Sequence, residues 1–234
     1  MTPISQDAID LIVAEEVSSQ ATYTARYQHP EWPGGASGVT IGIGYDVGYA
    51  TPMGFRADWT TIIPQDMVEA LSEVVGLTGE HARVALASVR HRVTVPWDAA
   101  MHVFMEHDVP KWVATVEQHL AHCGELAPDC LGALVSLAYN RGPSFERAGD
   151  RYAEMRTIKA LMASRHFDLI PAQLRSMKRL WASASMRGLV LRREHEARLF
   201  EKGLAEMAAH VATPVPAAAP DQSSSMPPAE PEQA

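Results

Sequence analysis

The chain has 234 residues, of which 47% are hydrophobic and 21% are charged. This length is enough for one well-packed domain, or for a small lobe beside a larger one. Because no run of about 18 apolar residues occurs, we expect no membrane-spanning helix and no stable membrane insertion. The N-terminus lacks the basic region and cleavage site of a secretory signal peptide, so we expect synthesis in the cytoplasm without one.

The formal net charge of −8 is spread unevenly along the chain. Residues 1–146 carry 7 Lys/Arg and 18 Asp/Glu, a net of −11, whereas residues 147–202 carry 13 and 6, a net of +7. The basic segment can attract a polyanion such as cell wall or nucleic acid, or it can be a solvated surface paired with the acidic part. No nucleic-acid-binding motif accompanies it, so we expect no nucleic-acid partner.

The first predicted helix covers residues 5–18, with Ser5 as its N-cap. Its apolar stripe, at helical spacing, consists of Ile9, Ile12 and Val13. Glu16 continues this stripe, so we expect it at the edge of the core, with Glu15 nearer the polar side. Partial burial favours the protonated form of a carboxyl group, as a general acid requires. A helix-end glutamate that reaches water or pairs with an arginine fits the same pattern.

Residues 20–50 hold six glycines and two prolines around a β-prone run at 39–43, and this composition predicts a small irregular β-lobe. The period of two within a strand predicts one shared face for Thr40, Gly42, Gly44 and Asp46. The two glycines leave bare backbone on that face, which a bulky ligand can approach closely. Alternatively, these glycines form a tight hairpin, with Asp46 as a turn residue.

Residues 64 to 210 have a helical pattern. It predicts helices over 64–75, 79–91, 96–121, 128–140, 151–164, 168–180 and 187–209. We expect Pro110 to break or kink the third of these. Residues 212–234, rich in Pro, Ala and Ser, are expected to be disordered. The chain is thus predicted to be an α+β protein, mostly α, with one domain over residues 1–211; no heptad pattern demands a partner, so we expect a monomer.

A carboxylate on a helix and another on a loop, beside an open glycine-lined surface, form the layout of glycoside hydrolysis. The string TIGIGYD at 40–46, preceded by Glu16 on a first helix, resembles the phage-type lysozymes of glycoside hydrolase family 24. Residues 133–142 and 187–203 resemble that family's central and C-terminal helices. The resemblance spans most of residues 5–203 and implies a lysozyme-like fold, with a small β-lobe and a larger helical lobe.

Ordinary members of that family carry the second carboxylate nine residues after the catalytic glutamate, where this chain has Ala25. With an insertion at 28–37 before the strand, the chain more closely resembles the pesticin-type muramidase domain. That resemblance implies Glu16 as general acid, Asp46 as base for the attacking water and Thr40 as the residue that positions this water. Inversion at the anomeric carbon is expected.

Further residues are weaker candidates for the site. Glu31, within the insertion, is a rival for the second carboxylate and ranks below Asp46. Tyr45 and Asn140 are candidate substrate contacts, although Asn140 also fits a helix C-cap. Two arginines of the last predicted helix can bind wall carboxylates, but we expect them to be structural, in a buried pair with a glutamate; these residues are Arg192, Arg193 and Glu196.

The remaining reactive side chains indicate no further chemistry. His119 and His122 share a helix face, but no HExxH motif occurs, so we expect surface histidines, no metal and no cofactor. Cys123 and Cys130 are expected to be partly buried thiols rather than a disulfide.

The resemblance implies cleavage of the β-1,4 bond between N-acetylmuramic acid and N-acetylglucosamine in peptidoglycan. Such an enzyme would act in the periplasm, as a phage endolysin after holin release or as an antibacterial effector delivered by a secretion system. An effector would have an immunity protein as a partner. A catalytically silent peptidoglycan-binding module is the alternative, and a docking protein is a third reading.

Overall fold

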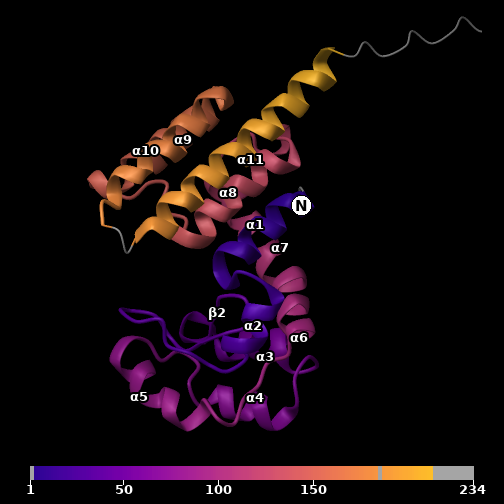
Figure 1. Ribbon diagram of the computed structural model, residues 1–234, viewed down its shortest axis with the longest axis vertical. Coiled ribbons are helices and arrows are strands. Elements are labelled where there is room, and N and C mark those ends of the chain that lie inside the picture. Colours follow the sequence, from indigo (N-terminus) through magenta and orange to yellow (C-terminus); the bar gives the residue numbers. More distant parts are fainter. Residues whose placement is uncertain (1–2, 184–185, 213–234) are drawn as a thin grey trace, which may run out of the picture.

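The computed structural model describes residues 3–183 and 186–212 and is mostly helical, with one small antiparallel sheet (Figure 1). This confirms the predicted class, α+β and mostly α. The first part of the chain contains α1 (Gln6–Val17), α2 (Gln20–Arg26), β1 (Thr40–Ile41), β2 (Tyr45–Asp46), η1 (Val47–Tyr49), α3 (Pro52–Trp59), α4 (Gln65–Ser72) and α5 (Gly79–Val89). The second part contains α6 (Trp97–Val103), η2 (Phe104–Asp108), α7 (Val109–His119), η3 (Cys123–Glu125), α8 (Pro128–Arg141), η4 (Asp150–Tyr152), α9 (Ala153–Ala163), η5 (Phe167–Leu169), α10 (Ile170–Ser176), η6 (Met177–Leu180) and α11 (Arg187–Ala212).

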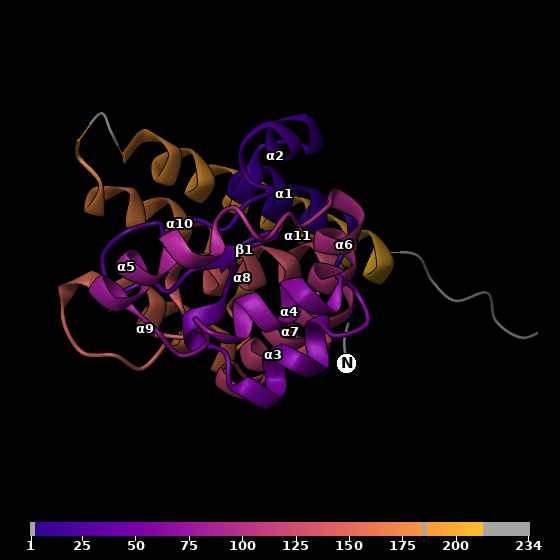
Figure 2. The same ribbon diagram turned by 90° about the horizontal axis from the view of Figure 1, so that it is seen from below.

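Helix α8 is the centre of the larger group of helices. It packs against α1, α7 and α11, and every residue from 129 to 138 is buried. Helices α9 and α10 pack on each other, and α10 also packs on α11. In Figure 1 these helices lie above, and the hairpin lies below with α2 to α6; Figure 2, seen from below, shows α3 to α5 in front of α8 and α11. The chain therefore divides into a hairpin-bearing lobe and a helical lobe.

The small irregular β-lobe predicted over residues 20–50 is confirmed in part, because residues 31–46 contain a hairpin and an isolated bridge whereas residues 20–26 are helical. Its sheet comprises only β1 and β2, and its first seven residues form helix α2. Ser19 caps this helix by accepting a hydrogen bond from the backbone N–H of Thr22 at 3.1 Å. Helix α3 was also not predicted; Thr51 caps it, and Pro52 occupies its first turn. Both helices are too short for a clear apolar periodicity, so their capping residues are the better sequence evidence for them.

Pro110, predicted to break or kink the helix, does not break it; the helix type changes just before the proline. Helices α6 and α7 follow each other without a loop, joined by η2, a π-helix in which the N–H of Val109 bonds the carbonyl of Phe104. Pro110 then stands in the first turn of α7, where an N–H is not needed for an intrahelical bond. The wider π turn just before it lets the helical path continue through the proline.

The other predicted helices are present, with ends that differ by a few residues. The helix predicted over 151–164 begins as the 3₁₀ turn η4, and the one over 168–180 divides into η5, α10 and η6. Most of the segment predicted to be disordered, residues 213–234, lies outside the described residues. Within the described part of the chain, no helix is long and apolar enough to cross a bilayer.

Candidate functional site

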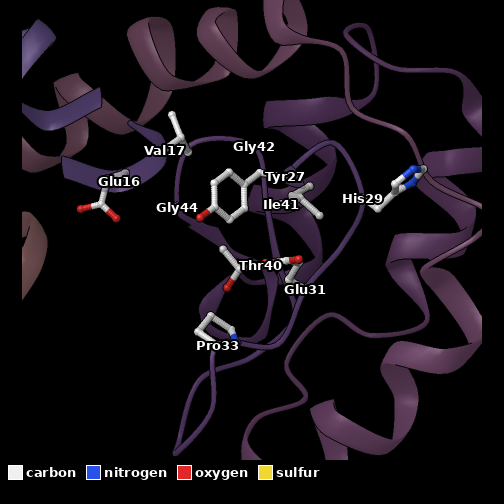
Figure 3. Close-up of a pocket in the computed structure, with 10 residues that line it drawn as sticks. All are labelled: Glu16, Val17, Tyr27, His29, Glu31, Pro33, Thr40, Ile41, Gly42 and Gly44. Carbon is white, nitrogen blue, oxygen red and sulfur yellow. The ribbon is translucent and has the colours of Figure 1, made fainter. Parts of the chain in front are cut away.

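A pocket of about 250 Å³ opens where the end of α1 faces the hairpin (Figure 3). We call it the Glu16 pocket. Three groups of residues line it, from the end of α1, from the segment before the hairpin and from the hairpin itself: Glu16, Val17, Tyr27, His29, Glu31, Pro33, Thr40, Ile41, Gly42 and Gly44. The structure thus brings together two residues predicted as catalytic, Glu16 and Thr40, and the rival carboxylate Glu31.

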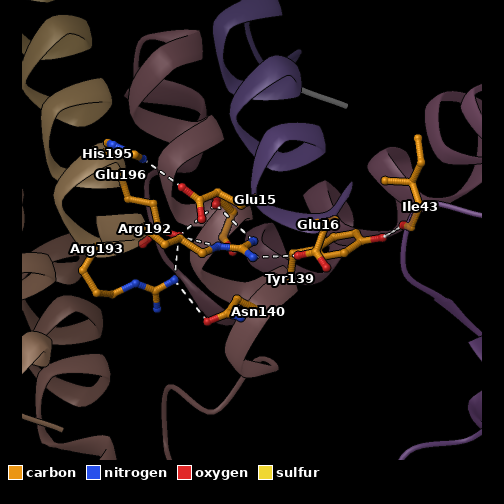
Figure 4. A network of polar contacts seen from close by, with 10 residues as sticks. Glu15, Glu16, Ile43, Tyr139, Asn140, Arg192, Arg193, His195 and Glu196 are labelled. Atoms are coloured by element: carbon orange, nitrogen blue, oxygen red, sulfur yellow. Dashed lines mark hydrogen bonds and ion pairs between the residues drawn. The ribbon is translucent and has the colours of Figure 1, made fainter. Parts of the chain in front are cut away.

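Glu16 lies in the last turn of α1 and is held by a buried arginine of α11 (Figure 4). Its Oε1 is 2.6 Å from Nη1 of Arg192; the Arg192 side chain is 3% exposed and that of Glu16 is 23% exposed. Burial alone would lower the pKa of Arg192, but the negative charges of Glu16 and Glu196 outweigh it and raise that pKa above its ordinary value. The arginine therefore remains a fixed positive charge behind the glutamate.

The arginine belongs to a buried polar network that contains the predicted pair with Glu196 and joins α11 to α8. Oε1 of Glu196 accepts hydrogen bonds from Ser136 Oγ at 2.8 Å and from Arg193 Nη2 at 2.7 Å. Nη2 of Arg192 donates to the carbonyl of Ser136 at 3.1 Å. Arg192, Arg193 and Glu196 are all buried, so the predicted burial of this arginine–glutamate pair is confirmed. The network sets the position from which Arg192 reaches Glu16.

The prediction that Glu15 lies nearer the polar side is wrong. Its side chain is 16% exposed, less than that of Glu16, and its Oε1 lies 2.8 Å from Nδ1 of His195 on α11. The periodicity of α1 described one buried face, but α11 covers a second face of the same helix. Glu15 therefore lies between helices, and Glu16 lies at the pocket.

The predicted alternation along the glycine-rich strand is also wrong, because the chain turns there. Gly42 and Gly44 have φ angles of +60° and +78° and lie in the turn between β1 and β2. The hairpin alternative is therefore the correct interpretation of these glycines. Thr40 and Asp46 nevertheless share a face, because they are paired across the two strands. A bridge pairs Glu31 with Thr40 on its other side, so three polar residues form one row.

Asp46 belongs to this row, but its carboxylate is directed to backbone N–H groups rather than into the pocket. It accepts hydrogen bonds from Gly38 at 3.0 and 3.1 Å and from Gly48 at 2.9 Å, the latter as the cap of η1. Burial raises the pKa of Asp46, although these N–H donors act in the opposite direction. As placed, Asp46 organises the hairpin and lies next to Thr40 in the row.

Glu31 is the second carboxylate that lines the Glu16 pocket. Its backbone N–H and carbonyl exchange hydrogen bonds with Thr40 at 3.0 and 2.7 Å, which fixes it beside the hairpin. Its side chain is 38% exposed and forms a loose ion pair with Arg90 at 3.7 Å. Its access to the pocket makes it a stronger candidate than the sequence suggested.

The structure does not support the two predicted substrate contacts. Tyr45 is 8% exposed, packs edge-on against Trp59 at 5.4 Å and donates its hydroxyl to Asp58 at 2.8 Å. Asn140 accepts a hydrogen bond from Arg193 at 3.2 Å, near the end of α8. Both residues stabilise the lobes around the site. Tyr27 and His29 line the pocket instead; the sequence signalled them only by their place at the insertion.

The histidines and cysteines form no metal centre in the part of the chain that the structure describes. No group of three or more His, Cys, Asp or Glu side chains there is arranged to hold an ion. His119 bonds the carbonyl of Thr115, and His122 lies 3.0 Å from Glu125. Cys123 and Cys130 are free and buried, as expected.

Comparison with known proteins gives one family match. A family model described as a domain of unknown function (DUF8812) matches residues 11–114. The matched segment contains all ten residues that line the Glu16 pocket, whereas the central helix α8 and Arg192 lie beyond it. A search of curated proteins found no match.

Proposed function

We propose that this protein is a peptidoglycan-cleaving muramidase with a lysozyme-like fold. The observation that carries the proposal is the position of Glu16, at a pocket between two lobes and held by the buried Arg192. Thr40 and Glu31 line the same pocket with a hydroxyl and a second carboxylate, and Asp46 is paired with Thr40 in the row. A pair of carboxylic groups at the scissile bond is the minimum that glycoside hydrolysis needs.

In this proposal Glu16 protonates the glycosidic oxygen as the bond to the leaving sugar breaks. A carboxylate of the row accepts a proton from the attacking water, and the Thr40 hydroxyl holds that water. Arg192 keeps the Glu16 side chain in place and stabilises the carboxylate that forms when its proton has left. The reaction uses water and yields a sugar with a new reducing end.

Two carboxylates compete for the role of base. Asp46 has the support of the resemblance to pesticin-type muramidases, and Glu31 has the support of its place in the pocket. The hydrogen bonds that Asp46 accepts from Gly38 and Gly48 do not exclude it, because a carboxylate has about four acceptor positions. We keep Asp46 as the proposed base and treat Glu31 as the alternative to be tested.

The proposed biological setting is bacterial cell-wall lysis. The protein would act as a monomer in the periplasm, either as a phage endolysin or as an antibacterial effector with a cognate immunity protein. The alternative function is that of a catalytically silent module that binds peptidoglycan on the same surface. The two differ in whether glycosidic bonds are cut, so a product assay separates them.

The test is digestion of isolated Gram-negative sacculi by the wild type, Glu16→Gln, Asp46→Asn and Glu31→Gln, with released fragments identified by mass spectrometry. We expect the wild type and Glu31→Gln to release disaccharide-peptides with reducing muramic ends, and the other two variants to lose about a hundredfold or more of this activity. Glu80→Gln, an exposed change on α5, is the matched control.

Activity in Asp46→Asn together with its loss in Glu31→Gln would assign the base to Glu31. If the wild type releases nothing but sediments with the sacculi, the muramidase proposal fails and the silent binding module replaces it.

A further inference from the structure

The wall of the Glu16 pocket that precedes the hairpin is the segment from Tyr27 to Pro33, most of it within the insertion noted in the sequence. This segment is fixed at several points. Tyr27 ends α2, with its N–H bonded to the carbonyl of Tyr23 at 2.7 Å. The carbonyl of Gln28 accepts a hydrogen bond from the N–H of Val95 at 2.8 Å, and Nδ1 of His29 bonds the carbonyl of Val93 at 2.9 Å. The wall is therefore held before any ligand binds.

The side chain of Tyr27 is half-buried and lies in the middle of the pocket view, with its hydroxyl on the side of Glu16 and Thr40 (Figure 3). The chain has six tyrosines, and four of them donate their hydroxyls to a carbonyl or carboxylate of the protein: Tyr23, Tyr45, Tyr49 and Tyr139. A fifth, Tyr152, lies under the guanidinium groups of two arginines. Among the described residues, Tyr27 has neither a hydrogen-bond acceptor for its hydroxyl nor an arginine over its ring. Tyr27 is also the tyrosine that lines the pocket.

The other polar groups of the pocket define which ligand fits beside this ring. Glu16 and Glu31 offer carboxylate oxygens, and Thr40 offers a hydroxyl. Neither Lys nor Arg is among the ten lining residues. Arg192 pairs with Glu16 and Arg90 pairs with Glu31, but neither arginine lines the pocket. A pocket of acceptors and hydroxyls favours an uncharged ligand that brings several hydrogen-bond donors, and disfavours an anion.

We propose that Tyr27 is a substrate-positioning residue that binds one uncharged N-acetylhexosamine ring against its aromatic face. An aromatic ring offers a large apolar surface to the C–H face of a sugar, and its hydroxyl can bond a sugar hydroxyl at the ring edge. The sugar bound on Tyr27 lies next to Glu16, and this places the neighbouring glycosidic bond at the proton donor. The inference rests on the proposed function for its substrate and adds a binding subsite at the end of α2, next to the insertion.

The test is binding of the N-acetylglucosamine tetramer to Glu16→Gln, to Glu16→Gln/Tyr27→Ala and to Glu16→Gln/Tyr27→Phe, measured by isothermal titration calorimetry. We expect the alanine variant to weaken binding about tenfold and the phenylalanine variant, which keeps the ring, by less. Glu16→Gln/Tyr49→Ala removes a tyrosine of the same lobe from outside the pocket and should bind as Glu16→Gln does.

With Glu16 intact, Tyr27→Ala should raise the sacculus concentration that gives half-maximal rate about tenfold and change the maximal rate far less. Unchanged tetramer binding and unchanged half-saturation in a folded Tyr27→Ala protein would overturn the inference while the muramidase proposal stands. If the wild type cuts no sacculi but tetramer binding depends on Tyr27, the muramidase proposal fails and the subsite remains. Far-UV circular dichroism checks the fold, and Tyr27→Leu, which removes the ring but keeps an apolar side chain, replaces the alanine variant in both measurements if that variant unfolds.

Discussion

At the residue scale, the position of Glu16 depends on a neighbour that has no side chain. A Cβ atom at Gly44 would lie 3.1 Å from the hydroxyl of Tyr139 and 3.4 Å from Oε2 of Glu16. The same Tyr139 hydroxyl donates to the carbonyl of Ile43 at 2.6 Å, so there is little room for it to move. The glycine therefore serves both the turn and the space beside Tyr139, and an added Cβ would also fill the space next to the Glu16 carboxylate.

We predict that Gly44→Ala loses most of the wall-cleaving activity, in addition to about 1 to 2 kcal/mol of stability from the strained positive φ. The control is Gly76→Ala, whose φ of +80° matches the +78° of Gly44 but whose Cβ would meet nothing within 4 Å. Chemical denaturation should show that both variants lose unfolding free energy because of the positive φ. The rate of sacculus digestion should fall only for Gly44→Ala. Equal activity in the two variants would show that Glu16 does not need the space at Gly44.

The sequence predicted which residues belong to the candidate site better than it predicted how they are arranged. Glu16 and Thr40 were predicted from helical spacing and from a motif, and both line the pocket. The common face of Thr40 and Asp46 was predicted for the wrong reason, because a period of two cannot pass through a turn. Tyr45 was misassigned, since a sequence does not show that a tyrosine hydroxyl has a buried partner such as Asp58.

At the scale of elements, α1, α8 and α11 form the support of the site through close approach. A Cβ on Gly132 of α8 would lie 2.1 Å from Cβ of Ala8 on α1. A Cβ on Gly203 of α11 would lie 2.6 Å from Sγ of Cys130 and 2.8 Å from its backbone nitrogen on α8. Long apolar periodicity predicted α8 and α11, whereas the contact surfaces between them depend on single small residues, which carry no periodic signal.

We predict that Gly203→Ala destabilises the protein by about 1 to 3 kcal/mol, because the added methyl group would meet the α8 backbone and force the two helices apart. Gly188→Ala is the control within the same helix: its Cβ would meet nothing within 4 Å, and alanine favours helix by up to about 1 kcal/mol. The measurement is urea denaturation followed by circular dichroism. Equal stabilities of the two variants would mean that α8 and α11 are not in close contact at Gly203.

At the scale of the whole molecule, a few polar contacts between distant parts of the chain fix the elements around the pocket, and one of them joins the two lobes. Tyr139 of α8 donates to the hairpin, and Arg192 of α11 reaches Glu16 on α1. Tyr23 of α2 donates to the carbonyl of Val95 at 2.9 Å, ahead of α6. These contacts join residues 72 to 176 positions apart in the chain. Local patterns predict helices, but they do not show which distant donors and acceptors meet, and the resemblance alone suggested how the lobes combine.

Glu196 provides the test of this network, because its fully buried carboxylate is shared by Arg192, Arg193 and Ser136. Burial raises the pKa of Glu196, whereas the two arginines act to keep it charged. Glu196→Gln leaves two buried guanidinium groups with less compensating charge, so we predict a loss of about 3 to 5 kcal/mol of unfolding free energy.

The matched control for this change is Glu201→Gln on the same helix, whose exposed ion pair with Arg175 at 2.5 Å should contribute less than about 1 kcal/mol. Urea denaturation near neutral pH measures both variants, and sacculus digestion well below the denaturation midpoint measures whether Arg192 still holds Glu16. We expect Glu196→Gln to lose activity even where it remains folded, because Arg192 is then free to leave Glu16. A folded Glu196→Gln protein with the activity of Glu201→Gln would show that Arg192 keeps its position without the buried network, and that the lobe contacts alone define the site.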